Sequence, residues 1–317
     1  MTQPEKVLLT GATGFVGQEL LKTLNALEVF TVITAGRCPA DKHSVFFHTE
    51  LTAQADFTSA LTGVSTVIHA AARTHIMRDE VAEPLAEYRR VNVEATLNLA
   101  RQAAAAGVKR FIFISTVKVN GEQTEPHCVF TAQQQPAPED AYGQSKAEAE
   151  LALKQLAAET GMGLVIIRPP LVYGAGVKGN FATLLKLAQK NLPLPLGGIN
   201  NKRSLVALDN LVDLVITCIT HPKAANQTFL VCDDNDLSTT ELLKLLTIAA
   251  GHSPRLLPVP VSWLKLAAKI TGKQAVISRL CGNLQLDISH TKNILGWTPP
   301  VSVEEGIKRC FEIKESV

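Results

Sequence analysis

The stretch Thr10-Gly11-Ala12-Thr13-Gly14-Phe15-Val16-Gly17 decides the fold. It follows an apolar run at Val7–Leu9, expected to be a strand, and precedes the amphipathic segment Gln18–Leu27, expected to be a helix. Glycines at such a turn keep it tight, let the backbone approach a pyrophosphate and let helix and strand pack closely. The phosphates then bind at the helix N-terminus. The stretch therefore predicts a dinucleotide-binding βαβ unit, whereas a glycine triplet in another context indicates only a tight turn.

Short runs rich in Val, Ile and Phe recur along the chain and are separated mostly by segments with helical periodicity. Parallel strands are buried on both faces, so they appear in a sequence as continuous apolar runs. We therefore predict an α/β fold with a doubly wound parallel sheet of the Rossmann type. Its strands are expected at 7–9, 29–33, 67–68, 111–114, 164–167 and 229–231, and residues 205–208 are expected to return to the sheet.

Helix ends are marked by residues with known capping preferences. Glycine follows the helical segments Ala95–Ala106 and Ser145–Thr160, and Ser238 with Glu241 forms a capping box before Leu242–Ala250. From about Leu171 onward, Pro and Gly interrupt the pattern, which predicts a second lobe of loops and short helices. We expect a dinucleotide-binding domain from 1–170 and 205–235, and a smaller, interleaved substrate-binding lobe from 171–204 and 236–317.

The composition excludes several classes of protein. The 317 residues are 46% hydrophobic and 19% charged, and the net charge is only +2, with no basic run that could neutralise a nucleic-acid backbone. The six cysteines show no Cys-x-x-Cys spacing and no neighbouring histidine at ligand spacing, so no metal site is expected. The N-terminus has no secretion signal, and the apolar stretches are shorter than a membrane span. We expect a cytoplasmic protein that binds neither nucleic acid nor a membrane.

The residues after the second expected strand bear on the choice of cofactor. A Rossmann site that prefers NAD presents Asp or Glu about 20 residues past the glycines, whereas an arginine accommodates the 2′-phosphate of NADP. Here the segment is Thr34-Ala35-Gly36-Arg37, and the first acid is Asp41. The segment favours NADP(H) over the alternative NAD(H), although Arg37 is also compatible with a solvated loop cation.

Five segments along the chain form a recognisable set. They are Thr10–Gly17, His69-Ala70-Ala71-Ala72, Asn92, Tyr142-x-x-x-Lys146 and Arg168-Pro169-Pro170-Leu171-Val172-Tyr173-Gly174. Together they resemble the extended short-chain dehydrogenases/reductases, the NAD-dependent epimerase/dehydratase family, in the branch that acts on nucleotide sugars. The similarity covers essentially the whole chain.

The resemblance also implies a set of cofactor contacts. The Ala70–Ala72 segment would pass under the cofactor, and Glu50 would lie beside the adenine, where relatives usually carry Asp. His69 is interpreted as an ordinary strand-end histidine. With Arg37, the expected cofactor-binding residues are Gly11, Thr13, Gly14, Phe15, Val16, Gly17, Glu50, Leu51, Ala70, Ala71, Ala72, Asn92, Ser115, Tyr142, Lys146 and Pro169.

Tyr142 and Lys146 are candidate catalytic residues. They lie four positions apart at the start of a helix, so they share one face at about 5–6 Å between Cβ atoms. A neighbouring ammonium and a positive nicotinamide ring would lower the pKa of the tyrosine from about 10. In the reductive direction the phenol donates a proton, which is a general-acid step.

A hydroxyl at the end of the strand Phe111–Ile114 is expected to bind the same substrate oxygen. Ser115 and Thr116 both offer one. Alignment with the family pattern Ser-Ser-x-x-Val-Tyr-Gly assigns the catalytic position to Thr116 and a supporting one to Ser115.

The chain departs from the 4,6-dehydratases of the family, which follow their threonine with Asp-Glu. Here Val117-Lys118 stands instead, which disfavours dehydration. Strand periodicity places Lys118 on the same face as Thr116, where it could contact substrate as a cation or reach solvent.

The resemblance further implies a UDP-sugar substrate. Arg203 matches the family's diphosphate arginine and Asn180 its substrate-contacting asparagine, while Arg279 and Thr74 are further candidates. The segments 72–78, 115–122 and 177–181 look most like the branch that reduces UDP-4-keto-6-deoxy-N-acetylhexosamine to UDP-N-acetylquinovosamine for surface polysaccharides.

Other functions stay open. They are a UDP-hexose or UDP-N-acetylhexosamine 4-epimerase, a reductase of non-nucleotide carbonyls, and a non-catalytic cofactor sensor. In the family, helices equivalent to 85–106 and 145–160 pair as a four-helix bundle, which predicts a homodimer.

Overall fold

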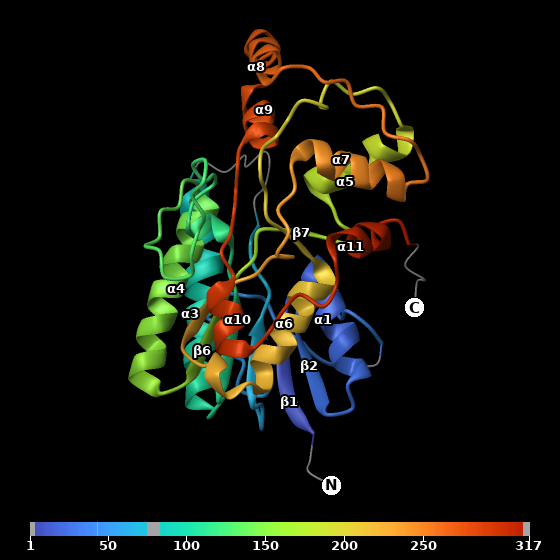
Figure 1. Cartoon of the computed structure of the whole chain (residues 1–317). Helices are drawn as coiled ribbons and strands as arrows, with labels where there is room; N and C mark the ends of the chain where they lie inside the picture. Colours follow the sequence, from blue (N-terminus) through green and yellow to red (C-terminus); the bar gives the residue numbers. More distant parts are fainter. Residues whose placement is uncertain (1–3, 43, 75–82, 313–317) are drawn as a thin grey trace.

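A seven-stranded parallel sheet forms the centre of the computed structural model, which describes residues 4–42, 44–74 and 83–312 (Figure 1). The strand order is β3-β2-β1-β4-β5-β6-β9, and every neighbouring pair runs parallel. This topology confirms the predicted doubly wound α/β fold. The strands are β1 (Glu5–Thr10), β2 (Phe30–Gly36), β3 (Val45–His48), β4 (Thr66–His69), β5 (Arg110–Ile114), β6 (Gly163–Arg168) and β9 (Gln227–Leu230).

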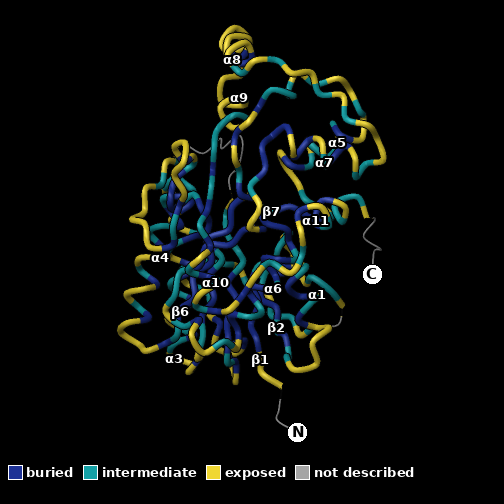
Figure 2. The backbone as a smooth tube through the Cα atoms, viewed as in Figure 1, coloured by how far each residue is buried: buried dark blue, intermediate teal, exposed yellow. Residues whose placement is uncertain are grey.

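Two apolar cores lie on the two faces of this sheet, because successive strand residues point to opposite sides. In β5, Ile112 packs with α1 (Phe15–Ala26) and α6 (Leu208–Thr220). The flanking Phe111 and Phe113 pack on the other face with α3 (Thr96–Ala105) and α4 (Ala141–Thr160). Figure 2 shows the sheet region as mostly dark blue between these helices.

The helix that leads into α3 contains a π-helical segment. α2 (Pro84–Arg89) continues into the π segment η1 (Arg90–Ala95) and then into α3, so helical structure begins well before the predicted start at Ala95. π-helical turns occur frequently at functional sites. Here the segment carries Asn92, which is buried.

The second lobe has its own small core around Tyr173, Phe181, Leu246 and Ile307. It lies at the carboxyl end of the central strands (Figure 1). Its elements are β7 (Leu171–Tyr173), α5 (Gly179–Lys190), β8 (Leu205–Ala207), α7 (Thr239–Ala249), α8 (Val261–Ile270), α9 (Gln274–Cys281) and α11 (Val303–Arg309), while α10 (Ser289–Leu295) packs against β9; short 3-10 turns lie at η2 (Val117–Val119) and η3 (Pro222–Ala224).

One strand prediction was wrong. Residues 205–208 do not return to the central sheet, because β8 pairs with β7 in a separate two-stranded sheet. The buried carboxylate of Asp233 holds this pair in place by accepting hydrogen bonds from Ala207 N and the Tyr173 hydroxyl. The predicted return near 229–231 is confirmed as β9. The domain boundaries remain a prediction.

The predicted caps are present. α4 ends at Gly161, whose φ of 74° is the left-handed conformation that favours glycine, and Ser238 with Glu241 forms the capping box of α7. Within the described ranges, none of the helices has the length and apolar character needed to cross a bilayer.

Candidate active site

The carboxyl ends of the central strands bring together most of the predicted cofactor residues. Gly11 follows β1, Ala70 follows β4, Ser115 follows β5 and Pro169 follows β6. The strand order reverses between β1 and β4, and open α/β sheets bind ligands at such a switch point. The tertiary fold therefore places the predicted residues where a dinucleotide is expected to bind.

The glycine loop fits a dinucleotide because side chains are sterically excluded from it. Gly11 has a φ of 77°, and a Cβ there would lie 2.6 Å from Ala71 N. A Cβ at Gly17 would lie 2.0 Å from the carbonyl oxygen of Gly11. Gly14 is the N-cap of α1 and has no side chain to occupy the first N–H groups of the helix, which can then hold a phosphate.

Other predicted cofactor residues surround the same edge of the sheet. Arg37 and Glu50 are exposed just beyond β2 and β3, Leu51 is half-buried, and Thr13 is exposed in the glycine loop. These positions agree with contacts to the adenosine half of a dinucleotide. Their roles remain predictions.

Asn92 connects the chain after β4 to the start of α4. Its side chain accepts a hydrogen bond from Arg73 N (2.8 Å) and donates to Arg73 O (3.0 Å) and the Ser145 hydroxyl (3.0 Å). Ser145 in turn donates to the carbonyl oxygen of Tyr142. Through Ser145, the Asn92 side chain helps to hold the backbone at Tyr142 in place. Asn92 is therefore a positioning residue as well as a candidate cofactor contact.

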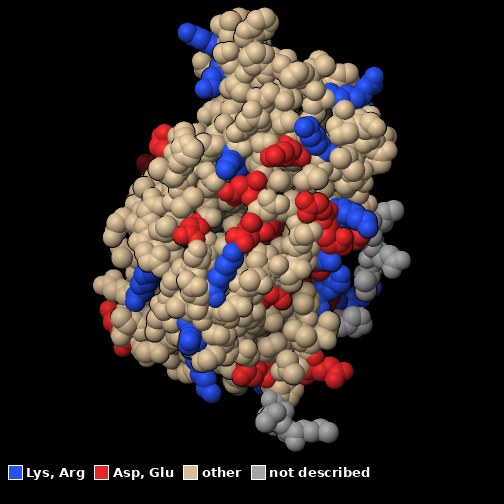
Figure 3. Space-filling view, viewed as in Figure 1, with Lys and Arg blue, Asp and Glu red and all other residues tan. Residues whose placement is uncertain are grey.

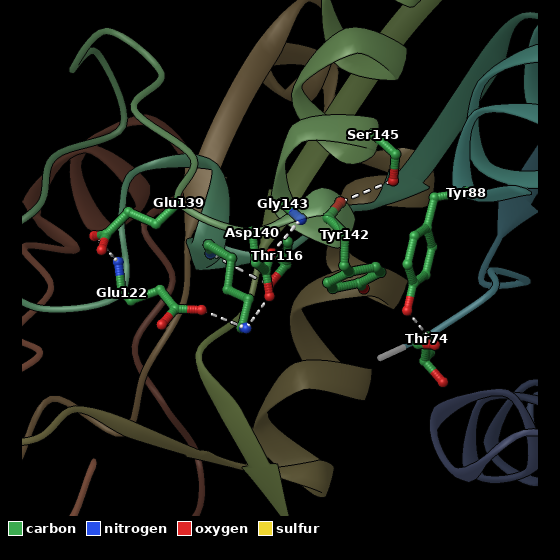
Figure 4. A network of polar contacts seen from close by, with 10 residues as sticks. Thr74, Tyr88, Thr116, Glu122, Glu139, Asp140, Tyr142, Gly143 and Ser145 are labelled. Atoms are coloured by element: carbon green, nitrogen blue, oxygen red, sulfur yellow. Dashed lines mark hydrogen bonds and ion pairs between the residues drawn. The ribbon is translucent and has the colours of Figure 1, made fainter. Parts of the chain in front are cut away.

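Tyr142 occupies the second position of α4, directly after a capped N-terminus. Asp140 is the N-cap, and its carboxylate accepts a hydrogen bond from Gly143 N (2.7 Å). The Tyr142 ring lies beside the Tyr88 ring, with 6.1 Å between centroids, and the Tyr88 hydroxyl donates to Thr74 O (Figure 4). This places the predicted substrate residue Thr74 beside the predicted proton donor.

The pKa of Tyr142 differs from the expectation. Burial, followed by the neighbouring Asp140 carboxylate and Tyr88, raises the pKa of Tyr142 above its usual value. The ammonium that was expected to lower it points elsewhere: Lys146 Nζ donates to Ile114 O (2.7 Å) and lies 3.8 Å from the centroid of the Phe113 ring. Burial lowers the pKa of Lys146 to about 7. The tyrosine is therefore held as a neutral phenol, which suits a proton donor.

His69 has the structural role that was expected. Its ring nitrogens hydrogen-bond the hydroxyls of Thr10 (2.7 Å) and Thr96 (2.9 Å). Burial and then the Lys146 charge lower the pKa of His69 to about 3. The ring is neutral and links β1, β4 and α3.

Thr116 is buried at the N-cap of η2, and its hydroxyl accepts a hydrogen bond from Lys118 N (3.3 Å). The strand periodicity used for Lys118 was wrong, because β5 ends at Ile114 and residues 117–119 form a 3-10 turn. The Lys118 ammonium donates to Asp140 (2.5 Å) and Glu122 (2.7 Å). Burial alone would lower the pKa of Lys118, but these hydrogen bonds raise it overall. The predicted substrate contact of Lys118 would therefore compete with two carboxylates.

Ser115 does not face the same way as Thr116. Its hydroxyl donates to Glu150 Oε1 (2.5 Å) in the core, where Glu150 pairs with Arg168. The structure gives Ser115 a partner in the core, and a direct cofactor contact by its hydroxyl would compete with that bond.

The predicted substrate residues of the second lobe come from different elements. Arg203 Nη1 donates to the carbonyl oxygens of Arg279 and Gly282 (both 3.1 Å), and burial lowers the pKa of Arg203. The Arg279 side chain is exposed on α9, and Asn180 is exposed in the first turn of α5. Arg203 thus fixes the backbone that carries Arg279, while Asn180 is not linked to either.

Three residues around Tyr142 were missed by the sequence analysis. Asp140 could have been found, because Asp just before a helix is a strong N-cap signal. Ser145 lies within the Tyr142-x-x-x-Lys146 spacing but carries no signal of its own. Tyr88 meets Tyr142 only through the packing of α2 against α4.

Comparisons with known proteins identify the family of the chain. The model of the NAD dependent epimerase/dehydratase family matches residues 7–232. The chain is 51% identical to a UDP-glucose 4-epimerase of Vibrio cholerae, over 98% of this chain and 95% of that protein. It is 29% identical to the N-acetyl-alpha-D-glucosaminyl-diphospho-ditrans,octacis-undecaprenol 4-epimerase of Escherichia coli O157:H7, over 97% of this chain and 95% of that protein.

Among solved structures, the fold matches a UDP-glucuronic acid 4-epimerase from Bacillus cereus in complex with NAD. The TM-score is 0.76, with 20% identity over 96% of each chain. The family model supports dependence on NAD and does not support the preference for NADP(H) that Arg37 suggested. The match of the family model over most of the chain, together with the 51% identical relative, shows that the chain is an enzyme of the NAD-dependent epimerase/dehydratase family.

Proposed function

We propose that the enzyme interconverts the C4 epimers of a UDP-hexose, with UDP-glucose as substrate and NAD as cofactor. The observation that carries this proposal is the 51% identity, over nearly the full length, to a UDP-glucose 4-epimerase. It favours the epimerase alternative over the reduction of a UDP-4-keto-6-deoxy-N-acetylhexosamine, which the sequence motifs had placed first.

The glycine loop of Gly11, Gly14 and Gly17 and the turn after β4 fit NAD because their backbones pack too closely for other side chains. When bound, NAD supplies a reversible hydride acceptor at the sugar C4. The backbone N–H groups at the start of α1 would hold its pyrophosphate.

Tyr142 and Thr116 would bind the C4 oxygen of the sugar. Burial keeps Tyr142 a neutral phenol in the NAD-free enzyme, and the positive charge of a bound nicotinamide ring would favour the phenolate. As the phenolate, Tyr142 takes the proton of the C4 hydroxyl in the oxidative half and returns it in the reductive half, as a general base and then acid. The Asp140 carboxylate contributes the charge next to Tyr142, while the Lys146 ammonium is held by Ile114 O. The dehydratases carry Asp at the position of Val117, directly after the threonine. The Val117 side chain is a buried hydrocarbon and offers no acid or base for dehydration.

An epimerase differs from a reductase in its net redox change. The purified enzyme with NAD is incubated with UDP-glucose, and the nucleotide sugars are separated by anion exchange or NMR. We expect UDP-galactose to form without net accumulation of NADH. Consumption of NADH or NADPH with a UDP-4-keto-sugar, and no epimer from UDP-glucose, would support the reductase instead.

The UDP moiety is tested separately by thermal shift. A ligand that binds only the folded state raises the unfolding temperature. We expect UDP at millimolar concentration to stabilise the wild type and Arg203→Met to be stabilised much less. No stabilisation of the wild type, with or without NAD, would rule out a nucleotide-sugar site.

Two structural expectations are part of this proposal. The predicted two-part division of the chain agrees with the separate small core of the second lobe. The predicted homodimer would use α2, α3 and α4, and Leu151 on the outer face of α4 is 70% exposed, as an interface residue of a free subunit would be. A monomer in light scattering would contradict the dimer.

A further inference from the structure

The helix α8 projects from the second lobe with an apolar face turned to solvent. Trp263, Leu266 and Ile270 are 70%, 61% and 79% exposed. At 3.6 residues per turn these three side chains fall within an arc of about 60°. The opposite side of the helix is anchored, because Leu264 and Ala268 are buried. Figure 2 shows the outer side of α8 in yellow at the top of the molecule.

The segment that carries this face is basic, and Glu125, from a different part of the chain, lines the same cavity as Lys265 and Lys269. Residues 242–286 contain no Asp or Glu. In the view of Figure 3, the region around α8 at the top of the molecule carries blue and tan atoms and no red ones. The basic residues of this segment are Lys244, Arg255, Lys265, Lys269, Lys273 and Arg279.

We propose that the exposed face of α8, formed by Trp263, Leu266 and Ile270, binds to the surface of a membrane that contains anionic lipids. An amphipathic helix with Trp and Leu on one side and Lys on the other lies in the plane of the interface with its apolar side inserted. Tryptophan favours the headgroup level. The nearby lysines extend their ammonium groups toward anionic headgroups.

The charge pattern favours a membrane over a second copy of the chain. Two copies meeting through α8 would bring Lys265 and Lys269 of both subunits together. Residues 242–286 contain no Asp or Glu, and Glu125, which lines the same cavity as the two lysines, would offset only part of their charge. Like charges at an interface oppose association. The negative headgroups of an anionic bilayer would neutralise the charge of the same lysines, and its apolar region would accept the apolar face of α8.

This proposal departs from the expectation that the protein binds no membrane, which rested on the absence of a membrane span. α8 has 10 residues, too few to cross a bilayer, and would lie on its surface. It is carried by the same α8–α9 segment as Arg279, so binding would place the second lobe, and not the central sheet, against the membrane.

The two tryptophans make the test specific. Trp297 is 5% exposed and donates a hydrogen bond to Asp213, so an added vesicle cannot change its surroundings without unfolding the chain. Trp263 is exposed. We expect vesicles of phosphatidylcholine with phosphatidylglycerol to shift the tryptophan emission to the blue and to protect it from acrylamide, and Trp263→Phe to abolish both effects.

Vesicle flotation measures binding independently of fluorescence. The triple variant Trp263→Ser/Leu266→Ser/Ile270→Ser should bind at least about tenfold less. Lys265→Gln/Lys269→Gln should weaken binding by about fivefold for each lysine. Val29→Ser is the matched control: Val29 is 62% exposed next to β2, far from the second lobe, and its replacement should not change binding. Unchanged thermal midpoints verify that the variants fold.

Three results would overturn the proposal. The first is that wild type does not float with anionic vesicles at low salt. The second is equal binding to neutral phosphatidylcholine vesicles, which would remove the role of the lysines. The third is a larger assembly in light scattering that the triple serine variant dissociates, which would assign the face to a second copy of the chain.

Discussion

The Glu150 carboxylate and the Arg168 guanidinium form an ion pair that solvent does not reach, with 2.5 Å between Oε2 and Nη2 and side chains that are each 2% exposed. Arg168 also donates to Asn120, and Glu150 accepts from Ser115, the residue before Thr116. The pair ties α4, which carries Tyr142, to the end of β6, and the hydrogen bond from Ser115 to Glu150 adds the end of β5, which leads to Thr116. It holds the two proposed catalytic side chains in relation to each other.

Glu150→Gln should therefore cost stability. Removing one charge leaves Arg168 buried without its counter-ion, a loss of about 3–5 kcal/mol in the free energy of unfolding. Denaturant unfolding measures the change. Glu148→Gln, which breaks the exposed pair with Arg89, is the matched control and should cost less than about 1 kcal/mol. Equal costs would show that the buried pair has no special structural role.

Gly17→Ala should disrupt the glycine loop. The added Cβ would lie 2.0 Å from Gly11 O, so the loop or α1 must shift, at a cost of about 1–3 kcal/mol, and NAD should bind more weakly. Gly36→Ala is the control, because no described atom lies within 4 Å of a Cβ built there. Thermal unfolding without ligand and NAD titration measure the two effects. A Gly17→Ala variant as stable as Gly36→Ala would contradict the close packing.

Tyr142→Phe should abolish most of the turnover. Loss of a general acid or base lowers kcat by about a hundredfold to ten-thousandfold, while binding of NAD and UDP should persist. The control is Tyr88→Phe, which removes the hydrogen bond to Thr74 O and keeps the neighbouring ring. Steady-state kinetics and thermal shift separate the two. Wild-type turnover by Tyr142→Phe would remove the proton-transfer assignment.

Lys146 should make the stability of the NAD-free enzyme depend on pH. Burial lowers its pKa to about 7 in the folded chain, whereas the unfolded chain keeps it protonated to about pH 10.4. Above pH 7 the unfolded state binds more protons, so the free energy of unfolding rises with pH, by about 2 kcal/mol between pH 7 and 8.5.

The test compares how the free energy of unfolding changes with pH in the wild type and in Lys146→Met. Buried cysteines such as Cys218, whose pKa burial raises to about 12, oppose the rise above pH 8.5. Lys146→Met should remove the rise below that pH, and Lys154→Met, at an exposed position on the same helix, should keep it. Parallel curves for wild type and Lys146→Met would show that the lysine is not titrating there.

The sequence alone determined the sheet and the nucleotide loop, because both depend on local patterns. Apolar runs mark buried parallel strands, and glycines mark the one turn in which a Cβ at Gly17 would meet Gly11 O. The spacing of Tyr142 and Lys146 likewise placed both residues on α4.

Only the tertiary structure decided how the charges around Tyr142 are arranged. Lys146 donates its hydrogen bond to Ile114 O, and Asp140 accepts one from Lys118. Tyr88 packs on Tyr142, and among the described residues no ammonium lies close enough to offset burial, so the pKa of Tyr142 rises. The pairing of β8 with β7 and the solvent-exposed face of α8 were also settled there. These features depend on contacts between residues that are distant in the sequence. A local sequence pattern does not say which distant residue will pack against a given side chain.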